Sequence, residues 1–362
     1  MAPRLEIDRH TLRMIAIAFV LLSALTIHRL FWAEVPGATE ALTLDGQTMG
    51  TTYQIRIAGA GLGESLHREV EAETNRRLDE VDRWLSDWNP ESEVSRFNAL
   101  ETTEGFPVSF ETAEVVAYAV ELCKWSTGAF DITVGPLVSR WGFGAGAQVD
   151  SPPSDEEIAT YLSRMGGRIL RIGRGNAKSG GFLRKFDPKV KVDLSAIAKG
   201  YGVDHVAEGL FELGRSDFLV EIGGEVFAAG ERPGGGPWRL GIEKPLEEGR
   251  QVQTIVELQD QGMATSGDYR IFYVENDQRI SHTIDPRTGR PVENGPAAAT
   301  VIAPSATEAD AWATTLMVMG QEGLELAEQY GLGALILTRT SDGEIVEHRN
   351  SLFPLPRGAA VK

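Results

Sequence analysis

Helical and strand patterns are mixed along this sequence without the regular βαβ rhythm that builds parallel sheets. Residues 64–86 and 112–126 carry apolar side chains at helical spacing, which predicts two helices. Residues 218–230, FLVEIGGEVFAAG, predict two strands joined at a glycine pair. The segments WRLGIEKP, QTIVELQ and AAATVIAP predict further strands. No G-x-G-x-x-G run leads from a strand into a helix, so the usual dinucleotide fingerprint is absent. We therefore expect an α+β fold with mixed, largely antiparallel sheets.

The charge of the chain limits its partners. The 362 residues have a formal net charge of −17, of which residues 1–33 contribute +2, so the remaining body carries −19. A body this acidic repels phosphate backbones, which makes nucleic acid a poor partner. The single cysteine, Cys123, excludes an internal disulfide and a cysteine-based zinc or iron–sulfur site, and its helical surroundings predict a core residue.

The amino terminus has the pattern of a membrane-targeting segment. Residues 14–27, MIAIAFVLLSALTI, form an uninterrupted apolar run behind three arginines. The positive-inside rule places the body of the chain across the membrane. Because no A-x-A cleavage site follows, we favour an uncleaved signal anchor over a cleaved signal peptide. The expected organisation is an anchor or signal peptide (1–33), a linker (34–45) and one folded domain (46–362).

Residues 142–188 are rich in Gly, Pro and Ser. This composition is typical of loops. We predict a surface excursion there, with one helix at 154–165.

The segment KVKVDLSAIAKGYGVDHVAEGL (189–210) predicts a strand that leads into a helix. Val190 and Val192 alternate with polar residues, Ser195 is expected to cap the helix, and Lys199 follows about one turn later. The amino terminus of a helix attracts anions through its free N–H groups and its dipole. With Lys199, the segment could hold a pyrophosphate. The alternative is an ordinary strand–helix junction with a lysine in solvent.

The segment PSATEADAWATTLMVMG (304–320) predicts a helix with oxygen ligands on one face. Ser305 and Glu308 have the spacing of a capping box. Asp310 and Thr314 are four residues apart and therefore share a helix face. Magnesium is typically bound by one or two carboxylates together with substrate phosphates. The alternative is an acidic residue that merely stabilises the start of its helix.

Other short segments add candidate residues. His282 precedes the turn signal DPRTGRP and could act as a general base, although a lone histidine is more often structural. Met49 lies in GQTMGTTYQIRI and could pack on a flat ring. Trp88 lies in LSDWNPESEVSRFN, where an aromatic side chain could stack on a flavin or adenine ring. Residues 127–144 (TGAFDITVGPLVSRWGFG) and 263–270 (MATSGDYR) complete the set.

In this order and at these spacings, the segments resemble the FAD:protein FMN transferase family, the ApbE-type flavin transferases. The matching motifs are TMGTTY, SEVSRFN, TGAFDITVGPLV, VDLSAIAKGYGVD, VEIGGEV, ATSGDYR, HTIDPRTGRPV and ADAWATTL. The resemblance implies a two-lobed α+β fold with FAD in the cleft, preceded here by one amino-terminal membrane helix. It implies a magnesium-dependent enzyme that transfers FMN from FAD, through a phosphoester bond, to a threonine or serine hydroxyl of a target flavoprotein. AMP would be released.

The resemblance also implies site residues in the domain 46–362. Catalytic roles would fall to His282 as the base, and to Asp310 and Lys199. Magnesium would be bound by the backbone carbonyl of Ala196 and by the side chains of Asp310 and Thr314. FAD would contact Met49, Trp88, Ala129, Phe130, Asp131, Asp193, Lys199, Ser266, Gly267, His282 and Ile284.

The resemblance extends to location and partners. Many family members are lipoproteins, but the only cysteine here is Cys123, so the amino-terminal helix itself must anchor the protein or be cleaved. We expect the inner membrane, with the body on the periplasmic side and a flavoprotein of a membrane electron-transfer complex as target. Two alternatives remain open. One is a magnesium-dependent FAD pyrophosphatase that gives FMN and AMP, and the other is a non-catalytic, membrane-tethered flavin-binding protein.

Overall fold

The computed structural model describes residues 41–59, 63–143, 151–246, 249, 251–268, 272–275, 278–293, 295–340 and 342–355. The expected membrane anchor (1–33) lies outside these ranges. Among the helices inside them, none combines the length and the apolar character needed to cross a bilayer.

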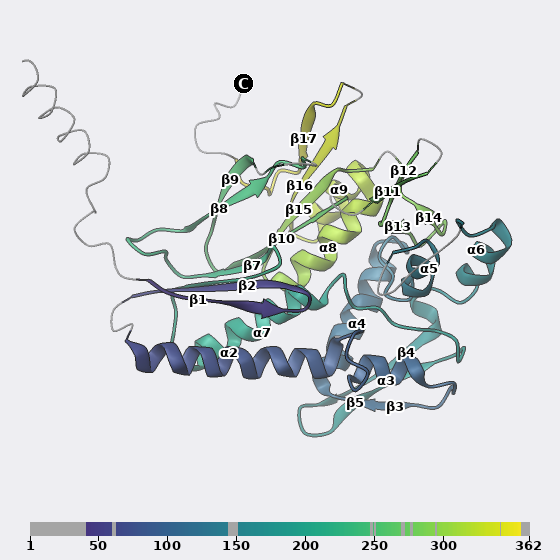
Figure 1. The fold of residues 1–362 in the computed structure, drawn as a ribbon, viewed down its shortest axis with the longest axis horizontal. Helices are drawn as coiled ribbons and strands as arrows, with labels where there is room; N and C mark the ends of the chain where they lie inside the picture. Colours follow the sequence, from purple (N-terminus) through teal and green to yellow (C-terminus); the bar gives the residue numbers. More distant parts are fainter. Residues whose placement is uncertain are drawn as a thin grey trace, which may run out of the picture.

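An eight-stranded sheet forms the centre of the molecule, and its neighbouring strands pair antiparallel (Figure 1). The predicted α+β fold with antiparallel sheets is confirmed. The hairpin predicted at 218–230 is present, and its turn residues Gly223 and Gly224 have φ of 63° and 108°, which side chains with a Cβ rarely adopt. Across the sheet the order is β1 (Ala41–Thr48), β2 (Thr51–Ala58), β6 (Phe218–Ile222), β7 (Glu225–Ala229), β10 (Gln261–Gly267), β15 (Ala298–Ala303), β16 (Gly333–Arg339) and β17 (Ile345–Arg349).

The folded domain begins earlier than the sequence predicts. β1 starts at Ala41, so the linker expected at 34–45 is wrong for residues 41–45. Leu42 and Leu44 are buried and alternate with exposed residues, and β1 pairs with β2 along its whole length. Burial with a period of two is what a strand with one covered face produces.

Two layers cover the central sheet. On one face lie α2 (Glu64–Leu85), α7 (Ala198–Glu212) and α8 (Ala306–Met319), with α2 running beside α7 (Figure 1). The hairpin of β8 (Trp238–Glu243) and β9 (Val252–Leu258) packs on the other face, against Met263 and Leu335 among others. α7 and α8 pack against each other and against the middle strands β7 and β10, where the candidate site lies.

A second lobe is built on α4 (Phe110–Trp125) beside the central sheet (Figure 1). Its three strands follow the order β3 (Phe106–Val108), β5 (Gly180–Lys185), β4 (Leu170–Asn176). The surface excursion predicted for 142–188 is therefore wrong for these strands, because their alternate apolar residues bury against α4 in spite of the glycine-rich composition. The helix predicted at 154–165 is present as α6 (Asp155–Leu162).

The helices predicted at 64–86 and 112–126 correspond to α2 and α4, and Cys123 is buried in α4 as expected. The remaining helices and strands are α3 (Glu93–Ala99), α5 (Gly135–Arg140), α9 (Gly323–Gln329), β11 (Phe272–Glu275), β12 (Gln278–Ser281), β13 (Ile284–Asp285) and β14 (Arg290–Pro291).

Candidate active site

A cleft of about 450 Å³ is lined by the start of α7, the inner face of α8, residues 129–134, and residues from β10 and β13. It brings together most of the residues predicted from the sequence. Met49 and Trp88 lie instead in an adjoining pocket of about 160 Å³, which shares Ser195 and Lys199 with the cleft. The predicted residues that line the cleft are Ala129, Phe130, Asp131, Asp193, Ala196, Lys199, Ser266, Gly267, His282, Ile284, Asp310 and Thr314.

Lys199 lies in the first turn of α7, between two carboxylates. Its ammonium nitrogen is 2.8 Å from Glu225 Oε1 and 3.7 Å from Asp310 Oδ1. Burial alone would lower the pKa of Lys199, but the two carboxylates outweigh burial and raise it, so the side chain remains charged. The predicted cap is wrong: Ile197 precedes the helix, and Ser195 makes no side-chain cap. Lys199 is therefore a half-buried cation paired with two carboxylates, and not a lysine free in solvent.

Residues 190–194 do not form the predicted strand. Val190 and Val192 are buried, but Val192 bonds to a side chain and not to a neighbouring strand. Asn98 Nδ2 donates to the Val192 carbonyl at 2.7 Å, and Asn98 Oδ1 accepts from the Val192 N–H at 2.7 Å. The next residue, Asp193, donates its backbone N–H to the Ile132 carbonyl at 2.7 Å. These bonds place Asp193 against the 129–134 segment at the edge of the cleft.

Asp310 is held by the backbone of α7. Its carboxylate is 2% exposed, and Oδ2 accepts a hydrogen bond from the Gly200 N–H at 2.9 Å. This N–H belongs to the first turn of α7, where helix N–H groups have no partner within the helix, so the carboxylate satisfies it. Only glycine permits this approach, since a Cβ on Gly200 would lie 2.3 Å from the carbonyl oxygen of Ala306. Ala196 precedes the helix and lines the cleft.

The oxygen atoms around this contact suit a hard divalent cation. Thr314 Oγ1 on α8 lies 3.3 Å from Ser266 Oγ on β10. Glu225 Oε2 is buried without a hydrogen-bond partner, which is costly unless a ligand satisfies it. The described part of the chain holds no group of three or more His, Cys, Asp or Glu side chains that could bind a metal ion. Backbone and hydroxyl oxygens would therefore complete the ligand set, as Mg²⁺ with substrate phosphates allows.

Glu225 is the site residue that the sequence argument missed. Burial, and then repulsion from Asp310, raise the pKa of Glu225 to about 8, while Lys199 acts in the opposite direction. The motif VEIGGEV contains this residue, but it indicates only a hairpin. A charged residue at the first position of a buried strand, directly after a glycine pair, was the available signal.

Asp131 fixes the loop that forms one wall of the cleft. Its Oδ1 accepts hydrogen bonds from the Thr133 N–H at 2.8 Å and from Thr133 Oγ1 at 2.7 Å. Burial raises the pKa of Asp131, and the bonds from Thr133 partly offset that effect. The carboxylate thus shapes the loop and thereby presents Ala129 and Phe130 to the cleft.

His282 lines the cleft just before the turn at 285–290. Its ring meets Phe143 edge-on, with 6.2 Å between ring centroids. The Arg287 guanidinium pairs with Asp285 at 2.8 Å inside the turn. The Trp141 indole N–H donates to the Gly289 carbonyl at 2.9 Å, which ties the turn to the 127–144 segment. These contacts hold the histidine at the cleft that residues of α7 and α8 also line.

The adjoining pocket carries the two remaining predicted residues. Met49 occupies the tight turn between β1 and β2 with φ of 49°, and its methyl group points toward Gly202 of α7. Trp88 follows the end of α2 and is 77% exposed. An aromatic side chain this exposed at the mouth of a pocket offers a free face for stacking.

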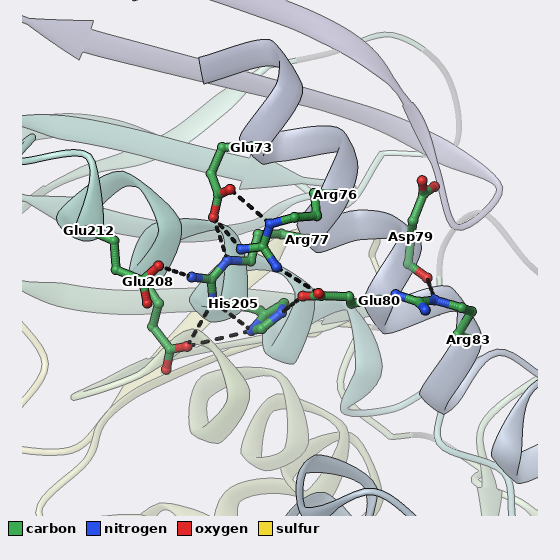
Figure 2. Close-up of polar contacts among 9 residues, drawn as sticks. All are labelled: Glu73, Arg76, Arg77, Asp79, Glu80, Arg83, His205, Glu208 and Glu212. Carbon is green, nitrogen blue, oxygen red and sulfur yellow. Dashed lines mark hydrogen bonds and ion pairs between the residues drawn. The ribbon is translucent and has the colours of Figure 1, made fainter. Parts of the chain in front are cut away.

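A buried ionic network ties α7 to α2 (Figure 2). Arg77 of α2 lies between Glu73, at 2.8 Å, and Glu212 of α7, at 2.6 Å. His205 of α7 contacts Glu80 of α2 through Nε2 at 2.9 Å. Because Lys199 belongs to the same helix, this network fixes the direction in which α7 enters the cleft.

Comparison with known proteins places these features in a family. The sequence profile of the ApbE family matches residues 49–336. A protein of Vibrio cholerae named FAD:protein FMN transferase is 43% identical over 316 residues, which are 87% of this chain and 92% of that protein. A protein of the same name from Escherichia coli K12 is 39% identical and covers 84% of this chain and 86% of its own length.

Solved structures agree with the sequence comparisons. The structure titled flavin transferase ApbE from Vibrio cholerae has a TM-score of 0.77 at 42% identity, covering 87% of this chain and 98% of that one. The apo flavinyl transferase ApbE of Pseudomonas stutzeri has a TM-score of 0.79 at 36% identity, covering 91% of this chain and all of that one. The profile, the relatives and the fold lead to one conclusion: the chain belongs to the ApbE family.

Proposed function

We propose that this chain is a magnesium-dependent FAD:protein FMN transferase. It takes FMN from FAD and joins it, through a phosphoester bond, to a threonine or serine hydroxyl of a target flavoprotein. The names of the relatives support the activity. The observation that carries the proposal in this molecule is the half-buried Lys199, held between Glu225 and Asp310 at a cleft of about 450 Å³.

The cleft residues suit a phosphoryl-type transfer, which depends mainly on positioning and charge stabilisation. Lys199 supplies a fixed positive charge for the pyrophosphate of FAD, and its two carboxylate partners keep it protonated and in place. The Ala196 carbonyl, Asp310 and Thr314 would bind the magnesium ion, which neutralises charge on the pyrophosphate when bound. Phe130 and Ile284 line the cleft as apolar surface for the flavin ring.

One phosphorus–oxygen bond forms in the transfer step and another breaks. The hydroxyl oxygen of the target attacks the phosphorus of the FMN half, and the bond from that phosphorus to the bridging pyrophosphate oxygen breaks. AMP leaves with the bonding electron pair. His282, which lines the same cleft as Lys199, accepts the hydroxyl proton.

We further propose that the protein acts outside the cytoplasm at the inner membrane. The apolar run at 14–27 behind three arginines supports an amino-terminal anchor. A target in a membrane electron-transfer complex would then lie on the same side of the same membrane.

Intact mass spectrometry tests the activity. The full chain is incubated with FAD, magnesium and a candidate target domain, and the target is weighed. The proposal predicts a mass gain of one FMN phosphoester that disappears when magnesium is chelated. If every target tested stays unmodified while free FMN and AMP appear, the protein is a pyrophosphatase. If FAD is bound but stays intact, the protein is a non-catalytic flavin-binding protein.

A further inference from the structure

The charge of this chain is distributed very unevenly. Residues 164–191 carry nine arginines and lysines and a single acidic residue, Asp187, for a net charge of +8. The whole chain has −17, so the residues outside this segment sum to −25. The segment contains β4 and β5, and five of its nine cations lie on these strands or in the turn between them: Arg171, Arg174, Lys178, Arg184 and Lys185.

The strand register places charge on the outer face of this sheet, defined here as the face opposite α4. Leu170, Ile172 and Leu183 point toward α4, so the residues between them point away. Arg171 and Arg184 are directly opposite each other on that outer face. Like charges at paired positions destabilise a sheet unless something compensates them.

Most of these cations have no carboxylate partner in the described ranges. Arg164 pairs with Asp187 and Arg174 with Glu114, while the buried Lys185 donates to two backbone carbonyls. The other six form no ion pair with a described acidic residue: Arg168, Arg171, Lys178, Arg184, Lys189 and Lys191.

Two aromatic side chains lie among the cations. Phe182 is 41% exposed and Phe186 is 52% exposed. The Phe182 ring covers Gly173 on β4, where a Cβ would come within 1.9 Å of it, so the ring lies flat on the outer face. The Arg184 guanidinium lies 5.6 Å from the centroid of the Phe186 ring. Exposed aromatic rings between arginines and lysines are the pattern of a surface that binds at a membrane interface.

We propose that the outer face of the β3–β5–β4 sheet binds an anionic phospholipid bilayer. The arginines and lysines contact lipid phosphates, and Phe182 and Phe186 enter the headgroup region. Charge complementarity selects this occupant, because residues 164–191 carry a net charge of +8 whereas the rest of the chain sums to −25. The sheet also lies at the edge of the molecule, far from the β16–β17 hairpin (Figure 1), so a bilayer can reach it without a clash with the central sheet.

Site-specific fluorescence on the full chain tests contact between this face and lipid. Cys123 is buried, so Ala177→Cys provides a labelling site at the exposed β4–β5 turn, and Glu344→Cys provides a control at the β16–β17 turn. Brominated phosphatidylglycerol should quench the label at 177 and leave the label at 344 bright. Vesicles of brominated phosphatidylcholine should quench neither label. This control also covers any insertion of the amino-terminal segment, which would bring the chain to both kinds of vesicle. An unquenched label at 177, or equal quenching by both lipids, would overturn the proposal.

Charge variants of the full chain test the electrostatic origin of binding. Each arginine or lysine near an anionic surface strengthens binding by about fivefold. The triple variant Arg171→Gln, Lys178→Gln, Lys189→Gln should therefore bind phosphatidylglycerol vesicles about a hundredfold more weakly. The control triple removes the same charge from exposed arginines elsewhere and should bind like the wild type: Arg56→Gln, Arg68→Gln, Arg83→Gln.

A different result would identify a different partner. If the first triple variant binds vesicles like the wild type but no longer modifies an acidic target domain, this face binds protein, and the lipid proposal fails. Equal loss of vesicle binding in both triple variants would also refute it, because net charge alone would then explain the effect. Neither result bears on whether the cleft transfers FMN.

Discussion

Replacing Gly200 by alanine should separate helices α7 and α8 at the candidate active site. The added Cβ would lie 2.3 Å from the Ala306 carbonyl oxygen and 2.8 Å from Asp310 Cβ. Both are atoms of a buried helix and cannot rotate away. Since ordinary contact begins near 3.4 Å, α7 must move by about 1 Å.

The expected magnitude follows from two opposing effects. Alanine in place of glycine inside a helix gains about 1 kcal/mol. Overpacking of a tight core contact costs typically ~1–3 kcal/mol or more, and here the obstacle is backbone. We expect Gly200→Ala to lose about 2 kcal/mol of unfolding free energy. A shift of about 1 Å at Lys199 and Asp310 should also slow FMN transfer by about a hundredfold.

Gly202→Ala in the same helix is the matched control. Its Cβ would meet Met49 Cε at 2.7 Å, the end of a flexible side chain that can rotate away. This variant should be as stable as the wild type or gain up to about 1 kcal/mol. Urea unfolding with equal m-values measures the difference. If Gly200→Ala is as stable as Gly202→Ala, the close contact between α7 and α8 is not present in the protein.

Three further predictions concern charge and proton transfer. Asp310→Asn retains an acceptor for the Gly200 N–H of α7 but removes the carboxylate charge. The transfer rate in the mass assay should therefore fall at least ~100-fold, whereas the control Glu308→Gln on the same helix should not change the rate. His282→Gln should slow single-turnover transfer by about 10²–10⁴-fold. The affinity for FAD, measured by fluorescence titration, should change little. An unchanged transfer rate would mean that another group is the base. The hydrogen bond from Arg76 is the main reason that the pKa of Glu73 is lowered to about 2. Glu73 therefore stabilises the folded state at pH values above its unfolded pKa near 4.5, and this stabilisation is lost as the pH falls toward 2. Glu73→Gln should therefore cost about 2 kcal/mol at neutral pH, after a discount for solvent screening, and this difference should vanish in denaturation curves near pH 2; a difference that persists there would refute the assignment.

The sequence predicts those parts of the fold that depend on local periodicity. The helices at 64–86 and 112–126 and the hairpin at 218–230 follow from apolar spacing and a glycine pair, and all are present. Prediction fails where tertiary contacts replace local ones. Val190 and Val192 alternate like a strand, yet a side-chain amide from Asn98 takes the place of a neighbouring strand.

At the candidate site, too, the sequence predicts some features and misses those that depend on tertiary contacts. Twelve of the residues that the family resemblance implies line one cleft, including residues more than 150 positions apart such as Ala129 and Asp310. The ion pair of Lys199 with Glu225 was not predictable, because Glu225 comes from a distant strand of the central sheet. The hydrogen bond from the Gly200 N–H to Asp310 was equally hidden, since it requires two helices to approach at a glycine.

A crystal structure of the full chain with FAD and magnesium tests the central claim most directly. We predict the flavin ring in the cleft beside Phe130, with the pyrophosphate next to Lys199 and the metal bound by Asp310. A second cavity of about 430 Å³, lined by Tyr118 and Tyr201 among others, is also large enough for part of a nucleotide. FAD bound there, with the cleft empty, would contradict the account.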